Sequence, residues 1–314
     1  MRSAFIETLC ELAAKDERIW LLTGDLGFSV LERFSDRFPD RFVNAGVAEQ
    51  NMTSVAAGLA QCGKIVFTYS IANFPTLRCL EQIRNDVCFH NANVKVTAVG
   101  GGLTYGTLGY THHSVEDLAV LRSLPNMTVV APGDPVESRL ATRAIVAHSG
   151  PCYLRLGADP LGEKALQEPI VHKADPAFVL GRAIPVREGK QLTLMSTGGM
   201  LKTVVEAAEE LAGDGIEAAV LSLHTVKPID QDAILAAADK TRLIMTVEEH
   251  SLVGGLGSAV AEVLAKARLG RVAFCSLGLE EGSMRRGSQQ YLREHAGLTP
   301  ESIAASARTL LEAS

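Results

Sequence analysis

The chain has 314 residues, of which 47% are hydrophobic and 21% charged, and this suits about two globular domains with substantial cores. Its formal net charge is -6 and its sequence pI is about 5.8, which argues against a nucleic-acid or anionic-membrane partner. The six cysteines are scattered without a CxxC pair, and no apolar run reaches the roughly 18 to 20 residues of a membrane span. We therefore expect reduced thiols and a cytoplasmic protein.

The first half of the sequence alternates helical and strand-like segments. Helical spacing predicts helices at 4–15, 49–59, 77–87, 114–121 and 136–147, and apolar runs predict strands at 19–22, 42–44, 64–69, 94–99, 127–131 and 152–156. Ser114 and Asp117 are expected to form a capping box at the start of their helix. This alternation predicts a parallel sheet that is covered by helices on both faces.

The pattern breaks into Pro, Gly and charged residues after Gly157 and then begins again. Strands are predicted at 191–195, 218–223, 242–247 and 272–277, and helices at 201–212, 230–238 and 257–266. We therefore expect an α/β protein with two doubly wound domains. The first spans residues 1–165, a linker spans 166–188, and a smaller α/β domain spans 189–314.

The ends of the predicted strands point to the site. Ligands of open α/β sheets bind at the carboxyl ends of the strands. The informative loops are therefore those that follow Leu22, Asn44, Tyr69, Val99 and Leu154.

Glu49 lies in a run of Gly, Ala and Val where a strand gives way to a helix. Desolvation favours the neutral form of a carboxyl group, so this residue could exchange a proton with a ring nitrogen of a ligand. The alternative is an ordinary acidic residue that faces the N-terminal dipole of its helix.

The stretch NAGVAEQNMTSVAAGLA resembles the segment of transketolases whose glutamate holds the aminopyrimidine ring of thiamine diphosphate. In that family the glutamate promotes the imino tautomer of the ring, which then removes the C2 proton of the thiazolium. The resemblance implies thiamine diphosphate as the cofactor and gives Glu49 this catalytic and cofactor-binding role. It also implies that residues 1–165 form a pyrimidine-binding domain.

The stretch FTYSIANFPTLRCLEQIRND is similar to the aromatic segment that packs on the aminopyrimidine in the same family. Phe74 falls at the stacking position, and the resemblance also places Tyr69 and Asp25 among the cofactor-binding residues. Ile71 and Leu77 replace two further aromatic residues, so a less aromatic pocket is expected. The alternative for Phe74 is ordinary core packing.

GTLGYTHHSVEDLAVLRSLPNMTVVAPGDPVE resembles the family's second site loop. His112 matches a catalytic histidine that contacts oxygens of the substrate, and His113 replaces a glutamine. Both histidines and Glu116 are close enough in sequence to suggest a metal site. We expect none in this chain, because no third ligand cluster is present and adjacent histidines rarely face one ion.

Three residues match contacts to substrate phosphate in the family. They are Arg2 in MRSAF, Ser29 in GDLGFS and Arg155 in CYLRLG, and each alone would be an ordinary surface residue. Together they imply a sugar phosphate substrate, because a guanidinium group matches the geometry of phosphate oxygens.

Two departures from the family concern the donor sugar. A histidine of ordinary transketolases is Gly100 here, and an aspartate that binds a donor hydroxyl is Leu108. Neither residue can hydrogen-bond a hydroxyl through its side chain. We therefore expect a donor other than the common ketose phosphates.

The second domain shares the resemblance. TVKPIDQDAI and VEEHSLVGGLGSAVAEVL are similar to the transketolase C-terminal domain. The GGLGS loop alone could bind a phosphate at a helix N-terminus. It lacks the full dinucleotide-binding spacing, so we expect a tight structural turn or an interface element.

The signature of the diphosphate site is missing. Thiamine enzymes bind the diphosphate through Mg²⁺ on a domain marked by Gly-Asp-Gly and a later Asn. Gly213-Asp214-Gly215 is present, but no Asn follows Asn126. We interpret Met1 followed by Arg2 as a natural start. The resemblance then implies a separate diphosphate-binding subunit that holds Mg²⁺, in an α2β2 heterotetramer.

The leading hypothesis is the small subunit of a split thiamine-diphosphate-dependent transketolase, active only with its partner. It would transfer a two-carbon ketol unit from a ketose to an aldehyde. The alternatives are the β subunit of the first component of a 2-oxoacid dehydrogenase, a deoxyxylulose-phosphate-synthase-like carboligase, and a non-enzymatic α/β binding module. Arg2, Ser29 and Arg155 favour a phosphorylated sugar, whereas Glu49 with Phe74 argues against a binding module.

Overall fold

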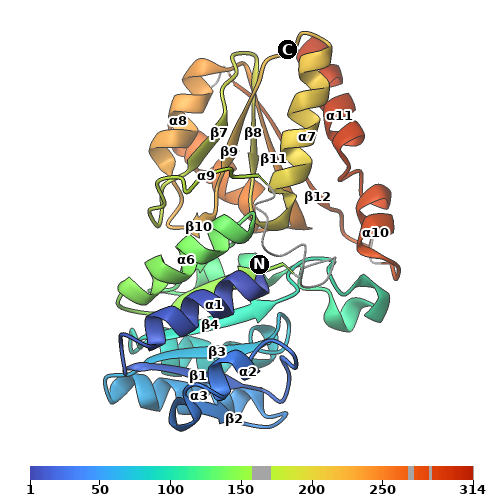
Figure 1. Cartoon of the computed structure of the whole chain (residues 1–314). Helices are drawn as coiled ribbons and strands as arrows, with labels where there is room; N and C mark the ends of the chain where they lie inside the picture. Colours follow the sequence, from blue (N-terminus) through green and yellow to red (C-terminus); the bar gives the residue numbers. More distant parts are fainter. Residues whose placement is uncertain (158–170, 268–271, 283–284, 314) are drawn as a thin grey trace.

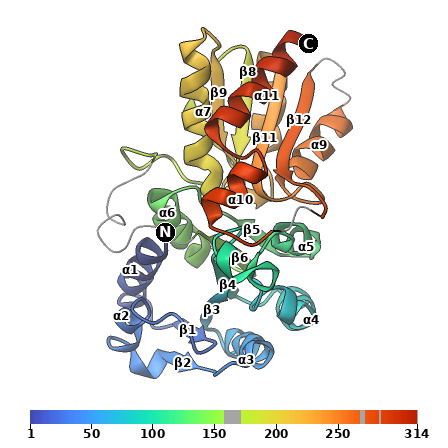
Figure 2. The ribbon, with the colours of Figure 1, turned by 90° about the vertical axis from the view of Figure 1, so that its right-hand side faces the viewer.

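The computed structural model describes residues 1–157, 171–267, 272–282 and 285–313. Each half of the chain builds its own α/β domain, the first in the lower and the second in the upper part of Figure 1. The N-terminus lies at the boundary between the two domains (Figures 1 and 2).

The first domain contains a seven-stranded sheet in the order β10-β5-β6-β4-β3-β1-β2. Its strands are β1 (Ile19–Thr23), β2 (Phe42–Asn44), β3 (Ile65–Ile71), β4 (Val94–Val99), β5 (Thr128–Val130), β6 (Cys152–Leu156) and β10 (Thr225–Lys227). All pairs are parallel except that of β10 with β5. The central strand β4 is buried along its whole length, as its run of Val residues predicts for a strand covered on both faces.

Helices cover both faces of this sheet. The helices α1 (Arg2–Ala13), α2 (Glu32–Ser35) and α6 (Pro135–Ala147) contribute to one hydrophobic cluster, and α3 (Glu49–Gln61), α4 (Leu80–Gln82) and α5 (Asp117–Ser123) pack against or within the other. The start of α6 is fixed locally, because the Asp134 side chain accepts a hydrogen bond from the Glu137 amide and Pro135 occupies the first turn.

The second domain contains a five-stranded sheet in the order β12-β11-β8-β9-β7. Its strands are β7 (Ile184–Arg187), β8 (Leu192–Ser196), β9 (Ala218–Ser222), β11 (Leu243–Ser251) and β12 (Ala273–Leu279). The helices α7 (Leu201–Gly213) and α11 (Pro300–Ala313) pack on one face, and α8 (Gln231–Lys240) and α9 (Leu256–Ala267) on the other. The helix α10 (Gln289–His295) lies at the boundary between the domains (Figure 2).

The predicted fold class is confirmed, with two α/β domains whose sheets are mainly parallel. Two strands were not predicted. The strand β10 comes from the second half of the sequence but joins the first sheet. The strand β7 falls within residues 166–188, the range predicted as a linker, and pairs with β9 of the second sheet. Residues 158–170 of the same region lie outside the described residues.

The predicted capping box at Ser114 and Asp117 is wrong. The helix α5 begins at Asp117, with Glu116 as its N-cap. Ser114 instead pairs with Gly102 in an isolated bridge. The Asp117 carboxylate is taken by a buried ion pair with Arg155, whose Nε lies 2.8 Å from Oδ2.

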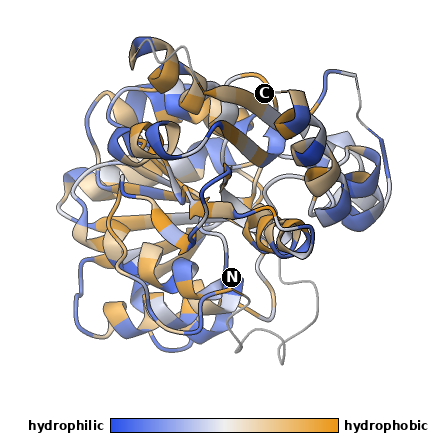
Figure 3. Cartoon of the chain, turned by 90° about the horizontal axis from the view of Figure 1, so that it is seen from above, coloured by the Kyte–Doolittle hydropathy of each residue, from blue (hydrophilic) through white to orange (hydrophobic). Residues whose placement is uncertain are grey.

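The described helices have hydrophobic and hydrophilic sides in the view from above (Figure 3). Such sides are typical of helices that pack one face on a core. Within the described ranges, every helix is too short or too polar to span a bilayer.

Candidate functional site

Glu49 lies at the start of α3, where the loop after β2 enters the helix, and its exposed fraction is 2%. Its Oε2 accepts a hydrogen bond from Arg78 Nη1 at 2.8 Å. The loop after β1 packs on it closely, because a Cβ at Gly24 would lie 3.2 Å from Glu49 Cγ. The buried carboxyl predicted from the sequence is therefore present, but it is ion-paired rather than surrounded only by apolar atoms.

Phe74 and His112 lie beside this ion pair. The guanidinium carbon of Arg78 lies 4.5 Å from the centroid of the Phe74 ring. The Phe74 and His112 rings are 5.3 Å apart with an interplanar angle of 72°. The structure therefore brings Glu49, Phe74 and His112 to one site, with Arg78 between the carboxylate and the ring.

His112 belongs to the segment between β4 and α5, residues 100–116, which we call the site loop. An antiparallel bridge between Gly102 and Ser114 closes its base. Asn73, in the loop after β3, donates hydrogen bonds to the carbonyl oxygens of Thr111 and His113. This side-chain amide fixes the His112 region against the Phe74 loop.

The Tyr105 ring packs directly against Gly100, the residue that the resemblance aligned with a histidine of the family. Gly100 has a φ of +82°, and a Cβ there would lie 2.1 Å from Tyr105 Cε2. The Tyr105 ring is 6.5 Å from the His112 ring. Burial raises the pKa of Tyr105, while the charge of Arg2 acts in the opposite direction.

Asp25 follows Gly24 in the loop after β1 and is bonded to Asn44 at the end of β2. Its backbone amide donates to Asn44 Oδ1 at 3.1 Å, and Asn44 Nδ2 donates to its carboxylate at 3.0 Å. Ser29 is exposed further along this loop, and its amide donates to Glu32 Oε1 at 2.9 Å. Leu108 is 53% exposed on the site loop.

Two predicted site residues have other surroundings. Tyr69 is fully buried, with its ring stacked 6.1 Å from Phe5 of α1, on the opposite face of the sheet from the α3 cluster. Arg155 is 5% exposed and donates to Asp117 and to the carbonyl oxygens of Ser114 and Glu249. The cofactor role of Tyr69 and the phosphate role of Arg155 stay predictions, which these contacts do not favour.

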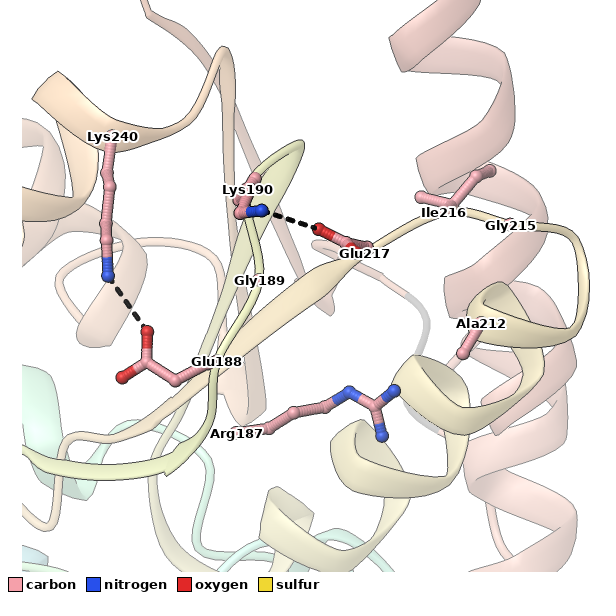
Figure 4. A pocket seen from close by; sticks show the side chains of 9 residues that line it. All are labelled: Arg187, Glu188, Gly189, Lys190, Ala212, Gly215, Ile216, Glu217 and Lys240. Carbon is pink, nitrogen blue, oxygen red and sulfur yellow. Dashed lines mark hydrogen bonds and ion pairs between the residues drawn. The ribbon is translucent and has the colours of Figure 1, made fainter.

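A surface pocket of the second domain lies elsewhere (Figure 4). It is lined by Arg187, Glu188, Gly189, Lys190, Ala212, Gly215, Ile216, Glu217 and Lys240. Two of its cations are paired, Lys240 with Glu188 at 2.9 Å and Lys190 with Glu217 at 4.0 Å. It lies at the amino ends of β8, β9 and β11, the edge of a parallel sheet where ligands rarely bind.

Two motifs that could bind phosphate are engaged within the chain. Asp214 of the Gly-Asp-Gly motif accepts a hydrogen bond from Arg308 at 2.8 Å. At the GGLGS loop, the Glu248 carboxylate accepts the amides of Leu256 and Gly257 at 2.6 and 2.7 Å. The N-terminus of α9 is therefore occupied by an internal carboxylate, which fits the structural turn predicted from the sequence.

The sequence did not reveal Arg78, Asn73 or Tyr105 as site residues. Arg78 follows Phe74 by four positions in the sequence. The available signal was that a cation so close to a proposed site residue could pair with the proposed buried glutamate. Asn73 and Tyr105 gave no signal, because their roles depend on contacts with residues distant in sequence.

Comparison with known proteins agrees with this geometry. Residues 1–161 match the transketolase pyrimidine-binding domain, and residues 181–303 match the transketolase C-terminal domain. A 6-deoxy-6-sulfo-D-fructose transketolase subunit of Clostridium sp. (strain MSTE9) is 41% identical over 99% of this chain and 94% of its own length. An apulose-4-phosphate transketolase subunit of Phocaeicola vulgatus is 38% identical over 96% of this chain and 94% of its own.

A solved structure described as a split gene transketolase, inactive beta4 tetramer, superposes with a TM-score of 0.86. It shares 36% identity and covers 99% of this chain and 97% of its own. The two domain matches and these full-length similarities lead to one conclusion. The chain belongs to the transketolase family, of which it carries the pyrimidine-binding and C-terminal domains.

Proposed function

We propose that this chain is the pyrimidine-binding subunit of a split transketolase, which transfers a two-carbon ketol unit from a ketose to an aldehyde. The observation that carries the proposal is the meeting of Glu49, Phe74 and His112 at the carboxyl ends of the strands. The relatives named as transketolase subunits have about the same length as this chain, which favours a separate subunit over a full-length carboligase. Their names favour a transketolase over the dehydrogenase alternative, which would also be a subunit.

The residues fit the aminopyrimidine half of thiamine diphosphate. Glu49 offers a buried carboxylate as an acceptor for a ring nitrogen proton, and Phe74 offers a half-buried ring for stacking. Arg78 engages Oε2, so Oε1 is the oxygen that would face the ring. When bound, the cofactor supplies the carbon nucleophile that accepts the ketol unit.

The chain's own residues have separate tasks in this proposal. Glu49 holds and releases a proton at Oε1, where burial excludes water that would compete for it. His112 hydrogen-bonds substrate oxygens from the site loop, and Asn73 holds that loop against Phe74. Arg2 is assigned the contact to an anionic group of the substrate, because its charge acts on Tyr105 of the site loop.

The proposal includes a second, different subunit as partner. A second subunit would carry the diphosphate site and Mg²⁺, and the pair would assemble as α2β2. The names of the similar proteins support this, since two are named as subunits and the split-gene structure is described as an inactive tetramer of β chains. These names support the requirement for a partner, and the α2β2 stoichiometry is our own proposal.

The donor is proposed to be a modified or branched sugar with an anionic end. The named relatives act on a sulfonated fructose and on apulose 4-phosphate. Gly100 and Leu108 remove two side-chain partners for donor hydroxyls, while the charge of Arg2 acts on Tyr105 of the site loop. Comparing kcat/KM for xylulose 5-phosphate, fructose 6-phosphate and such sugars tests this, and use of xylulose 5-phosphate at about 10⁴ M⁻¹s⁻¹ or better would contradict it.

Glu49→Gln tests the proposed role of this residue in the assembled enzyme. The amide cannot release a proton to the ring, so the rate of cofactor C2 proton exchange should fall by about 100-fold or more. Glu262→Gln, which removes an exposed carboxylate far from Glu49 in sequence, is the control and should leave exchange unchanged. An exchange rate in Glu49→Gln within a few-fold of wild type would show that Glu49 has another role.

A further inference from the structure

The site loop is packed into the second domain although it belongs to the first. Leu103 and Val115 lie near the two ends of this loop, with exposed fractions of 2% and 0%. Both belong to the hydrophobic cluster built from β8, α7 and α11 of the second domain. The base of the loop is therefore part of a core that its own sheet does not provide.

Glu249 of β11 contacts the first residues of the site loop. Its Oε1 accepts the Leu103 amide at 2.6 Å, and its exposed fraction is 4%. Two side chains of α10 hold the same carboxylate, with Arg293 Nε at 2.8 Å and Gln289 Nε2 at 2.9 Å. Gly102 permits the approach, because a Cβ there would lie 2.8 Å from Glu249 Cγ.

The end of the loop is tied to the same strand. Arg155 Nη2 donates to the Ser114 carbonyl at 2.8 Å and to the Glu249 carbonyl at 3.1 Å. The Ser251 amide donates to the Val115 carbonyl at 2.8 Å. Both ends of the loop therefore meet on β11, one through the Glu249 side chain and the other through the strand backbone.

The segment that leads into α10 holds the middle of the loop. The Gly287 amide donates to the Gly106 carbonyl at 3.2 Å, and Arg286 Nε donates to the Thr107 carbonyl at 2.6 Å. A Cβ at Gly106 would lie 2.4 Å from a methyl carbon of Leu292. Figure 2 shows α10 at this boundary, and α10 contacts the turn Gly106–Leu108 of the site loop.

We propose that Glu249 and Arg293 of the C-terminal domain are positioning residues for the site loop. Their ion pair fixes the Leu103 amide, and through it the placement of Tyr105 and His112. The catalytic consequence rests on the proposed function, since a displacement of about 1 Å in a reacting group can cost roughly 100-fold in rate.

Hydrogen exchange of the chain tests the contact itself. Glu249→Gln keeps the size of the side chain but removes its charge, so amides in residues 103–114 should exchange about 10-fold faster. The matched control is Glu262→Gln. Glu262 of α9 pairs with Arg122 of α5 at 2.8 Å, so it also joins the two domains, but it does not contact the loop. The control should leave loop exchange unchanged.

Unchanged loop exchange in Glu249→Gln would overturn the proposal, as would equal acceleration in both variants. If Glu249→Gln accelerates exchange throughout the chain, variants of Arg293 provide the test instead. The Arg293 side chain is 23% exposed, so its replacement should disturb the fold less. Arg293→Gln should then accelerate exchange in the loop alone, and Arg293→Lys should restore part of the protection. Loop protection that is unaffected in Arg293→Gln would also overturn the proposal.

Activity of the assembled enzyme provides the second readout. In Glu249→Gln, kcat/KM for the donor should fall by about 10-fold or more. The dissociation constant for thiamine diphosphate should stay within about 2-fold, because Glu49 and Phe74 lie on other loops. If kcat/KM for the donor and the affinity for thiamine diphosphate fell by the same factor, the result would contradict a positioning role. If no variant, including wild type, shows thiamine-dependent activity, the proposed function fails and the exchange result still decides the positioning proposal.

Discussion

Tyr105 fills the space beside Gly100 in the site loop. The backbone at Gly100 has a φ of +82°, which side chains other than glycine rarely adopt, and the Tyr105 ring fills the space above it. A histidine placed at position 100 would therefore strain the backbone and displace the ring. The phenol hydroxyl is then the polar group available on that side of His112.

We expect Tyr105→Phe to lower kcat/KM for the donor by about 2- to 13-fold, because a neutral hydrogen bond contributes about 0.5 to 1.5 kcal/mol. Tyr110→Phe is the matched control on the same loop, since its hydroxyl bonds Glu116 at 2.8 Å and its side chain is exposed. Steady-state kinetics of both variants with the same donor provide the comparison. Equal effects would show that the Tyr105 hydroxyl has no specific contact with the donor.

The sequence predicted three of the residues that the structure brings together at the site and gave no indication of others. Glu49, Phe74 and His112 lie within contiguous stretches that resemble one family, so each was found by its neighbours in sequence. Arg78 and Tyr105 act through contacts made only after folding, to Glu49 and across Gly100. No local pattern contains such information.

At the scale of the elements, long apolar strands were predicted closely and edge elements were not. The strands β4 and β6 agree with the predicted bounds because both are buried along their whole length. The edge strand β7 contains Pro185 and exposed positions, so it resembles a linker in sequence. The three-residue β10 is a strand only through its antiparallel pairing with β5, which its own sequence does not reveal.

The segment between β9 and β10 contains a buried histidine that should make stability depend on pH. His224 is fully buried, with its ring stacked 3.9 Å from that of Phe178. Burial lowers the pKa of His224 to about 4, although the charges of Glu137 and Asp230 oppose the shift and that of His172 adds to it. His172 itself is affected differently, since burial lowers its pKa but the hydrogen bond to Glu137 and the charge of that residue outweigh burial and raise it.

The sign of the effect follows from these directions. Between about pH 6.5 and 4, the unfolded chain binds a proton at His224 that the folded chain does not, so stability is lost as the pH falls. The shift corresponds to about 3 kcal/mol. The pKa of His172 is raised above its unfolded value of about 6.5. The stability that His172 contributes is therefore present below about pH 6.5 and is lost as the pH rises above that value.

Urea unfolding at pH 7.5 and pH 5 should therefore show a smaller free energy of unfolding at pH 5. His224→Asn should reduce this difference, because the variant has no proton to gain at that position. The variant will be less stable at both pH values, so the comparison concerns the difference and not the absolute stability. An unchanged difference would contradict the assignment to His224.

At the scale of the whole molecule, the loops around the site leave apolar side chains exposed. Phe28 is 76% exposed, Val47 74% and Leu108 53%, and all three lie on loops at the carboxyl edge of the first sheet. Apolar groups gathered around a site are typical of a surface that another chain covers. This placement agrees with a cofactor site completed at a subunit interface.

Co-expression with a partner chain that carries the Gly-Asp-Gly and Asn signature should give an α2β2 assembly. Two-fold arrangements are the commonest closed assemblies, and the proposed cofactor site needs one chain of each kind. Mass photometry of the purified complex measures the stoichiometry. A complex that stays one-to-one at working concentrations would contradict this prediction.

The most direct test is to titrate thiamine diphosphate with Mg²⁺ by calorimetry into the chain alone and into the assembled complex. The proposed pyrimidine half-site accounts for Glu49 and Phe74 but for none of the contacts to the diphosphate. We expect no tight binding and no turnover with the chain alone, and binding with ketol transfer in the complex. Micromolar binding by the chain alone, or a complex that does not bind the cofactor, would contradict the split-transketolase account.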